Sequence, residues 1–410
     1  YVDQTGKRAE SMFVDVVPRE DGGYFALDVN RGRIFSYDRQ GLLLYIFGSP
    51  GTSRGSFYSA SAMERVGKKI LVADKSLGSI TVFSMTEFGR AVDTAVKMSG
   101  EGKIQEEKAA WENVLRLCSN YDIAHINLAE IETNNKQYSS AMKRLSSVGE
   151  KEQYGIAYRY ARNEWLKKNF YLLVLILVVL AGLAVVWKKA VSKTEAVVHI
   201  RSNRFYKELK FGTYTMFHPF DGFWDLKREC RGSLKSAIVI LSLFVLWFGI
   251  RARFTGYLFM NVAYKDVNVA KSIATVLIPL LLWTVSNWCF TTLMDGKGTM
   301  KDTFIAVCYA LTPYVVFSPL QFFLSFVLVG EETAFYWYLE SVIWAWVIIL
   351  IFFGMMMTHD YSFSKSLITA VLTLIGICLI LFICLLMFNL FYEVYTYFYD
   401  IYKEISFRFY

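Results

Sequence analysis

Six apolar runs constrain this chain more than any other feature. Residues 170–187, "FYLLVLILVVLAGLAVVW", carry no charge and are long enough to cross roughly 30 Å of hydrocarbon as a helix. Because backbone groups in lipid must satisfy one another's hydrogen bonds, such runs predict transmembrane helices. The second run is short before Arg251 and Arg253, so its helix is expected to extend through them or to depend on snorkelling. The other five runs lie at about 236–250, 272–294, 303–329, 341–357 and 366–392.

The distribution of Lys and Arg predicts which side of the membrane each loop occupies. The loop at 188–235 is dense in both residue types, whereas the "GEET" loop at 330–333 has acids and no base. Basic loops stay on the cytoplasmic side. We therefore expect the 188–235 loop to be cytoplasmic and residues 1–169 to be outside. An even number of spans would return the C-terminus to the outside.

Two stretches repeat within the polar N-terminal part. "FALDVNRGRIFSYD" from Phe25 and "LVADKSLGSITVFS" from Leu71 align at an offset of 46 residues. Each predicts a strand, an Asp-led turn with Gly, and a second strand, because Gly accepts positive φ and Asp bonds its local backbone. The period is that of propeller blades, and the pattern resembles NHL repeats.

Residues 1–85 are therefore expected to form part of a β-propeller. Two blades do not close a ring, which typically needs four to eight. We accordingly expect the chain to be the C-terminal portion of a longer protein. A small open β-meander is the alternative.

Residues 86–169 change to a helical pattern. "NLAEIETNNKQYSSAMKRL" has Ala129 where two helices would cross, with Tyr138 and Ala141 after the turn. The stretch at about 103–160 resembles a tetratricopeptide hairpin, which implies peptide binding or a spacer. A plain helical stalk remains the other interpretation.

The stretch 217–233, "FHPFDGFWDLKRECRGS", mixes aromatic residues with both signs of charge. Its aromatic residues recur at helical steps, which predicts an interfacial helix at the lipid boundary. Pro219 and Asp221 suit its start, and Lys227, Arg228 and Arg231 suit its end. The segment is either a membrane-surface helix that seats the bundle or a docking surface for a partner. The candidate partner-contact residues are Phe220, Asp221, Phe223, Trp224, Asp225 and Arg228.

Other polar residues near the spans are further candidates. Glu340 enters the fifth run, where it is a partner contact or an interfacial carboxylate. Asn287 in the third run can bond a neighbouring helix. After the last run, one stripe of a continuing helix would dock a partner or the chain's own outer region, or would simply face solvent. That stripe consists of Glu393, Tyr397, Asp400 and Glu404.

The membrane half resembles the Yip family over about residues 205–392. The resemblance rests on "HPFDGFWDLKRECRGSLKSA", "YALTPYVVFSPL" and "MMMTHDYSFSKSLITAVLTLIGICLIL", and on the number of spans. It implies a bundle of five helices after one anchor span. Pro313 and Pro319 interrupt the fourth run and predict a helix break there.

The expected fold is thus a mixed multidomain membrane protein. A partial β-propeller and an α-helical hairpin region lie outside, followed by six transmembrane helices, one anchor span plus a five-helix Yip-like bundle. The predicted boundaries are 1–85 for the blades, 86–169 for the helical region, 170–187 for the first span, 188–234 for the basic interfacial segment and 235–410 for the five-span domain with its outward C-terminal helix.

No catalytic pattern is found in the sequence. "DGKGT" at 295–299 lacks the upstream glycine of a phosphate-binding loop, and the four histidines stand alone. We therefore expect no enzyme, no cofactor, no metal site and no nucleic-acid partner. Neither paired intramembrane charges nor inverted repeats are evident, which argues against a channel or secondary transporter.

The order of the regions resembles Gram-positive bacterial proteins associated with carbohydrate uptake through ABC-type importers. That implies a non-catalytic accessory subunit for oligosaccharide uptake in the bacterial cytoplasmic membrane. Its partners would be ABC permease subunits, a separate ATPase, an extracellular solute-binding protein or saccharide, and membrane lipid. The alternative is an envelope scaffold or sensor that binds a surface ligand without taking part in transport.

Overall fold

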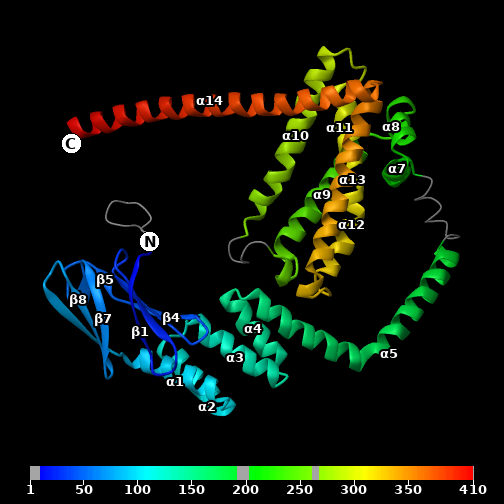
Figure 1. Ribbon diagram of the computed structural model, residues 1–410. Helices are drawn as coiled ribbons and strands as arrows, with labels where there is room; N and C mark the ends of the chain where they lie inside the picture. The colour runs from blue at the N-terminus through cyan, green and yellow to red at the C-terminus, as the bar shows by residue number, and fades with distance from the viewer. Residues whose placement is uncertain (1–9, 192–202, 261–266, 410) are drawn as a thin grey trace. The chain divides into compact units, whose positions relative to one another are not determined.

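A computed structural model describes residues 10–191, 203–260 and 267–409. The chain divides into two compact units, Tyr1–Asn163 and Glu164–Tyr410 (Figure 1). Residues 192–202, part of the basic loop at 188–235 that predicts the orientation, lie outside the described residues. The strands are β1 (Phe13–Pro18), β2 (Tyr24–Asp28), β3 (Arg33–Tyr37), β4 (Leu43–Phe47), β5 (Ser49–Pro50), β6 (Ser56–Phe57), β7 (Ala60–Val66), β8 (Lys69–Asp74) and β9 (Ser79–Ser84).

The helices follow the strands in the chain. Those of the first unit are α1 (Glu87–Glu101), α2 (Ile104–Leu117), α3 (Asp122–Asn134) and α4 (Tyr138–Val148), and α5 (Lys151–Val191) runs from it into the second unit. The remaining helices are α7 (Arg204–Phe217), α8 (Pro219–Arg228), α9 (Leu234–Phe254), α10 (Val269–Leu293), α11 (Met300–Ala310), α12 (Thr312–Leu324), α13 (Thr333–His359) and α14 (Phe363–Phe409).

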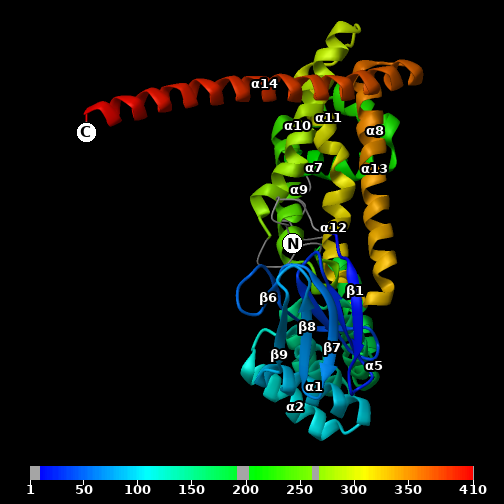
Figure 2. The same cartoon turned by 60° about the vertical axis from the view of Figure 1, so that its left-hand side comes forward.

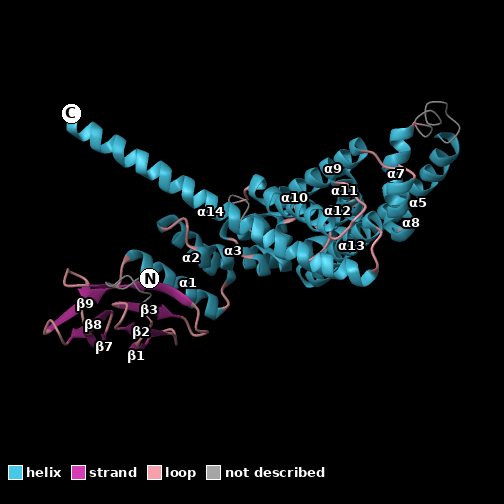
Figure 3. Cartoon of the chain, turned by 90° about the horizontal axis from the view of Figure 1, so that it is seen from above, coloured by secondary structure: helices cyan, strands magenta, loops and turns pink. Residues whose placement is uncertain are grey.

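Two antiparallel sheets form the β-part of the first unit, in the order β1-β2-β3-β4 and β7-β8-β9, with a short parallel pair β5-β6 (Figure 3). The predicted repeat is confirmed as the hairpins β2–β3 and β8–β9. Gly32 and Gly78 both adopt φ of 58° in the two turns. The two sheets share one apolar core that includes Leu27, Ile34 and Val72. The described strands form no closed propeller.

The repeated aspartates anchor the two hairpins. Asp28 accepts hydrogen bonds from the backbone N–H groups of Met12 (3.2 Å) and Arg31 (3.1 Å). Asp74 accepts four such bonds, from residues 58, 59, 76 and 77. Burial works to raise the pKa of Asp74, but these four donors outweigh it and lower the pKa below its ordinary value.

An arginine connects the first sheet to the helices that follow. The Arg19 side chain is almost fully buried and pairs with Asp21 (2.6 Å) and Asp93 (2.7 Å), the latter on α1. It also donates to the Ser36 hydroxyl on β3. Burial is the main cause of the raised pKa of Asp93, against which Arg19 acts. This network ties the end of β1, strand β3 and helix α1 together.

Helices α1 to α4 and the start of α5 pack as successive neighbours. Ala129 of α3 and Ala141 of α4 are fully buried in one small cluster with Leu145 and Ala157. The prediction that Ala129 lies where two helices meet is therefore confirmed. Small side chains let the helix backbones approach, as in helical hairpins.

Six helical segments in the described part of the chain are long and apolar enough to cross a membrane. They lie at the six apolar runs, so the prediction of a multi-pass membrane protein is confirmed. The second run continues as α9 through Arg251 and Arg253 to Phe254, one of the two possibilities left open by the sequence. Figures 1 and 2 show α9 to α13 side by side, with α14 crossing α10 near one end.

The fourth run breaks at one of its two prolines. Helix α11 ends at Ala310 and α12 begins at Thr312, with Pro313 in the first turn, where its missing N–H costs nothing. Pro319, in contrast, lies inside α12 without ending it. Tyr309 and Tyr314, on either side of the break, are buried in the main core of the second unit.

Replacing Asp74 with Ala should loosen the second sheet. Four backbone N–H groups lose their acceptor, and the expected cost is about 3 kcal/mol. Amide hydrogen exchange on the detergent-solubilised chain would show faster exchange across β7 to β9. Asp38→Ala is the matched control, because Asp38 accepts two backbone bonds at an exposed turn and solvent can replace them. Equal exchange in the wild type and Asp74→Ala would contradict this role.

Candidate functional site

Helix α8 forms where the mixed aromatic and charged segment predicts a helix. Pro219 occupies its first turn, Asp221 lies in the same turn, and Lys227 and Arg228 lie in the last. This order suits the helix dipole, with acid near the N-terminus and base near the C-terminus. The local sequence therefore explains both ends of α8.

Phe223 attaches α8 to the membrane bundle. Its side chain is 1 % exposed and belongs to the main core of the second unit. Gly354 of α13 makes room for the ring, since a Cβ at that position would lie 3.1 Å from Phe223 Cε1. The expectation that Phe223 lies at the lipid boundary is wrong. The aromatic residues of α8 lie on two faces of the helix. The bundle buries the face with Phe223 and leaves Phe220 and Trp224 exposed.

The C-terminal end of α8 is held by an ion cluster of Lys227, Arg228, Lys297 and Asp360. Arg228 pairs with Asp360 at 2.6 Å, and Lys297 approaches the same carboxylate at 3.4 Å. The Lys227 ammonium donates to the backbone carbonyl of Thr358. Burial lowers the pKa of Lys227. Arg228 thus contacts the turn between α13 and α14.

The remaining face of α8 points away from the core. Phe220 and Trp224 are 49 % and 43 % exposed, and Asp221 is also exposed. Phe220 packs its ring against Phe353 at 4.6 Å between centroids. Asp225 is partly buried and pairs with Arg231 at 3.1 Å. The surface available to lipid or a partner is therefore formed by Phe220, Asp221 and Trp224.

Helix α7 was not predicted from the sequence, yet it completes this end of the bundle. Glu208 is buried, accepts from Arg204 Nε (3.0 Å) and accepts from the Ser233 hydroxyl at the start of α9. The Tyr309 hydroxyl donates to the backbone carbonyl of Glu208 at 3.0 Å. Apolar residues at helical steps, Phe205, Leu209 and Met216, were the signal that could have revealed it.

A buried ion pair joins α9 to α13. Arg251 donates to the Glu340 carboxylate, to Tyr314 Oη (3.1 Å) and to Tyr336 Oη (3.2 Å). Trp344 Nε1 donates to the other Glu340 oxygen at 2.7 Å. The side chains of Arg251 and Glu340 are only 10 % and 18 % exposed. Glu340 therefore contacts a residue of its own chain and links α13 to α9.

This pair corrects the expectation that the spans carry no paired charges. Arg251 stands just after the second apolar run, so the sequence suggests that it belongs to the loop after the span. The helix continues for three residues beyond it, which brings its side chain back onto the bundle. Pairing and hydrogen bonding make such a charge tolerable in an apolar surrounding.

Helix α14 carries the last group of candidate residues. Glu393, Tyr397, Asp400 and Glu404 all lie on it and are exposed. Its N-terminal part is held on α10, where the Ser286 hydroxyl donates to the Thr373 carbonyl (2.8 Å) and Asn287 Nδ2 donates to the Thr373 hydroxyl (3.2 Å). The prediction that Asn287 bonds a neighbouring helix is confirmed. Between 381 and 407, every residue except Thr396 and Ile401 is exposed.

Helix α8 packs on the bundle, and helices α9 to α14 follow it in the chain. A family comparison covers this part of the chain. Residues 213–385 match the Yip1 domain. The chain is thus a Yip1-domain multi-pass membrane protein, and the comparison assigns no family to the region before residue 213. No curated protein matches the chain. Among the described residues, no cluster of three or more His, Cys, Asp and Glu side chains is placed to hold a metal ion.

Replacing Phe223 with Ala should release α8 from the Yip1 domain. Removing a fully buried ring costs roughly 3–5 kcal/mol through lost burial and the cavity that remains. Trypsin should then cut faster at Lys227 and Arg228 in the detergent-solubilised protein. Phe220→Ala, on the exposed face of the same helix, is the control and should leave the cleavage rate near that of the wild type. Unchanged cleavage in Phe223→Ala would show that the ring does not hold α8.

Neutralising only Glu340 should destabilise the Yip1 domain more than removing both charges. Glu340→Met leaves Arg251 buried without its carboxylate, which costs about 3–5 kcal/mol, whereas Arg251→Met with Glu340→Met leaves no buried charge. Thermal melts in detergent would measure the difference. Lys297→Gln, at an exposed pair, should cost less than about 1 kcal/mol. A double variant that melts below the single one would contradict the pairing.

Proposed function

We propose that this protein is a non-catalytic accessory membrane subunit of a bacterial ABC-type importer complex for oligosaccharides. In this proposal residues 1–169 are an extracellular interaction module that reaches a solute-binding protein or a saccharide. The Yip1 domain packs beside the ABC permease subunits, which couple to a separate ATPase. Residues 188–235 lie in the cytoplasm, and the C-terminus lies outside.

The uncovered length of α14 is the observation that supports this proposal most. The helix has 47 residues, hence a length of about 70 Å, more than twice the roughly 30 Å of a bilayer core. Lipid can cover the apolar run up to Tyr392. The continuation carries Glu393, Asp400 and Glu404 on one stripe together with many aromatic residues. Water would solvate the acidic residues of this stripe, but a docked protein surface would also cover the aromatic residues beside them, and that supports a partner.

The exposed part of α8 supports a second contact. Phe220 and Trp224 project from a helix that Phe223 and Arg228 already hold in place. A rigid aromatic surface loses little conformational entropy when it binds, which favours it as an anchor for a permease helix. The alternative is a membrane-seating role, in which the same rings contact only lipid.

The absence of a phosphate-binding loop in the sequence is consistent with a separate ATPase. The proposed role is therefore to assemble a complex, with no bond made or broken by this chain. An envelope scaffold or sensor would share the same surfaces. The two functions differ in whether solute uptake depends on the protein.

Affinity purification in mild detergent tests the proposal. The tagged wild type should bring down permease and ATPase subunits, and deleting the gene should lower oligosaccharide uptake. Changing Glu393, Asp400 and Glu404 together to Lys should release the permease, because three charges of the α14 stripe reverse. The control reverses Glu106 and Glu112, which are exposed acids on α2.

Two outcomes would contradict the importer role. Purification of this chain alone would exclude a stable complex with a permease. Partners that bind while uptake stays unchanged after deletion would instead favour the scaffold or sensor.

A further inference from the structure

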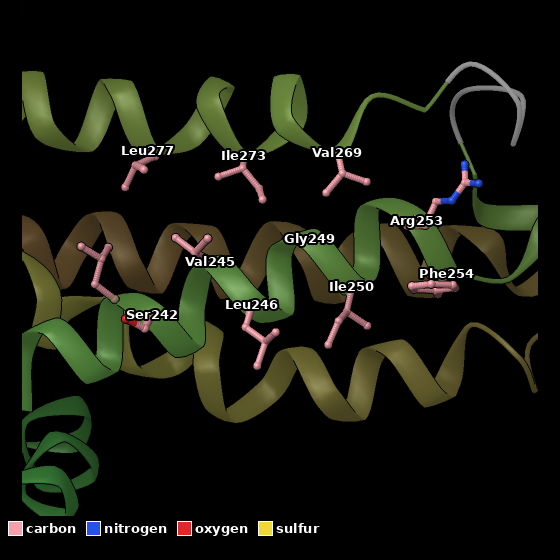
Figure 4. Close-up of a pocket in the computed structure, with 11 residues that line it drawn as sticks. Ser242, Val245, Leu246, Gly249, Ile250, Arg253, Phe254, Val269, Ile273 and Leu277 are labelled. Carbon is pink, nitrogen blue, oxygen red and sulfur yellow. The ribbon is translucent and has the colours of Figure 1, made fainter.

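A groove runs along the surface of α9 and α10 (Figure 4). Its volume is about 650 Å³, and aliphatic side chains such as Val245, Ile273 and Leu277 line it. Among the described residues that line it, Ser242 has the one hydroxyl, which donates to the backbone carbonyl of Ile238 at 2.8 Å. The length of the groove therefore offers apolar contact, and Arg253 is the one charged residue of that described lining.

A glycine sets the width of this groove. Gly249 lies at its middle on α9, opposite Ile273 of α10. A Cβ at position 249 would lie 3.3 Å from Ile273 Cδ1, so even a methyl group would touch the opposite wall. A larger side chain at this position would fill the groove.

The groove has the length of one lipid leaflet. From Ser242 to Arg253 α9 rises about 17 Å, and half of a bilayer core is about 15 Å. A helix about 10 Å wide over that length would occupy about 1,300 Å³, twice the volume present. The space fits an extended hydrocarbon chain better than a helix.

Positive charge stands at one end of the groove. Arg253 lies one residue before the end of α9, and Val269, the first residue of α10, lines the same part of the groove. The end of α9 and the start of α10 therefore lie at the same level, where the apolar run of α9 stops. A guanidinium has five donors and can bind a phosphate while it keeps another contact. Its charge complements an anionic headgroup.

We propose that this groove binds one anionic phospholipid, with an acyl chain lying in the groove along the surface of α9 and α10 and the phosphate on Arg253. The site is independent of the importer role, since it needs only the membrane. It would give the Yip1 domain a preference for the lipid that surrounds it. Lipid in the groove would also brace α9 against α10, next to the Arg251–Glu340 pair.

Native mass spectrometry of the full chain tests this site. The protein is reconstituted in equal phosphatidylglycerol and phosphatidylcholine and then extracted in mild detergent. The wild type should retain one phosphatidylglycerol. Gly249→Leu should reduce retention to background, whereas Gly182→Leu, at an open position of α5, should not. Arg253→Gln should lower the preference for phosphatidylglycerol about fivefold. One basic residue near anionic lipid contributes roughly 1 kcal/mol of binding free energy, which corresponds to that factor.

Arg204→Gln is the control for the loss of positive charge, because the Arg204 side chain is 81 % exposed on α7. Equal lipid retention in the wild type and Gly249→Leu would overturn the proposal. So would an unchanged preference in Arg253→Gln, which is the decisive variant if Gly249→Leu does not fold. A photo-crosslinker at Ile273 that captures a protein instead of lipid would also overturn it.

Discussion

Hydrogen bonding without water is the constraint on which the membrane half of this protein depends. In hydrocarbon, backbone groups must bond within helices, and each polar side chain needs a partner inside the protein. The two terminal nitrogens of Arg251 find their partners in Glu340 and two tyrosines. Asn287 Nδ2 finds one in Thr373, across the contact of α10 and α14. These contacts hold α9 to α13 and α10 to α14, so polar pairing and apolar packing act on the same helices.

Apolar packing and an ion pair likewise make α8 part of the bundle. A helix that only floated at the interface could keep all its rings in the lipid headgroup region. Here Phe223 enters the core against Gly354, and Arg228 pairs with Asp360 in the turn between α13 and α14. The contact between α8 and α13 thus makes a loop segment part of the Yip1 domain. It leaves Phe220 and Trp224 as a surface with fixed geometry.

The sequence predicted the elements better than their contacts. Apolar runs, the aspartate and glycine turns, and Ala129 each follow a local pattern, so the spans, the two hairpins and the helix crossing were predictable. Which face of α8 is buried depends on Gly354, more than a hundred residues away in the chain. The pairing of Arg251 likewise depends on α13. Pro319 was predicted to favour a break, yet α12 continues through it.

The central claim is that the two polar parts of the chain lie on opposite sides of the membrane. Cys118 is the one cysteine in residues 1–169, and Cys230 follows α8; both are exposed. Labelling with a membrane-impermeant maleimide distinguishes the two sides. In intact protoplasts Cys118 should react and Cys230 should react only after permeabilisation. Labelling of Cys230 in intact protoplasts, with Cys118 protected, would contradict the account.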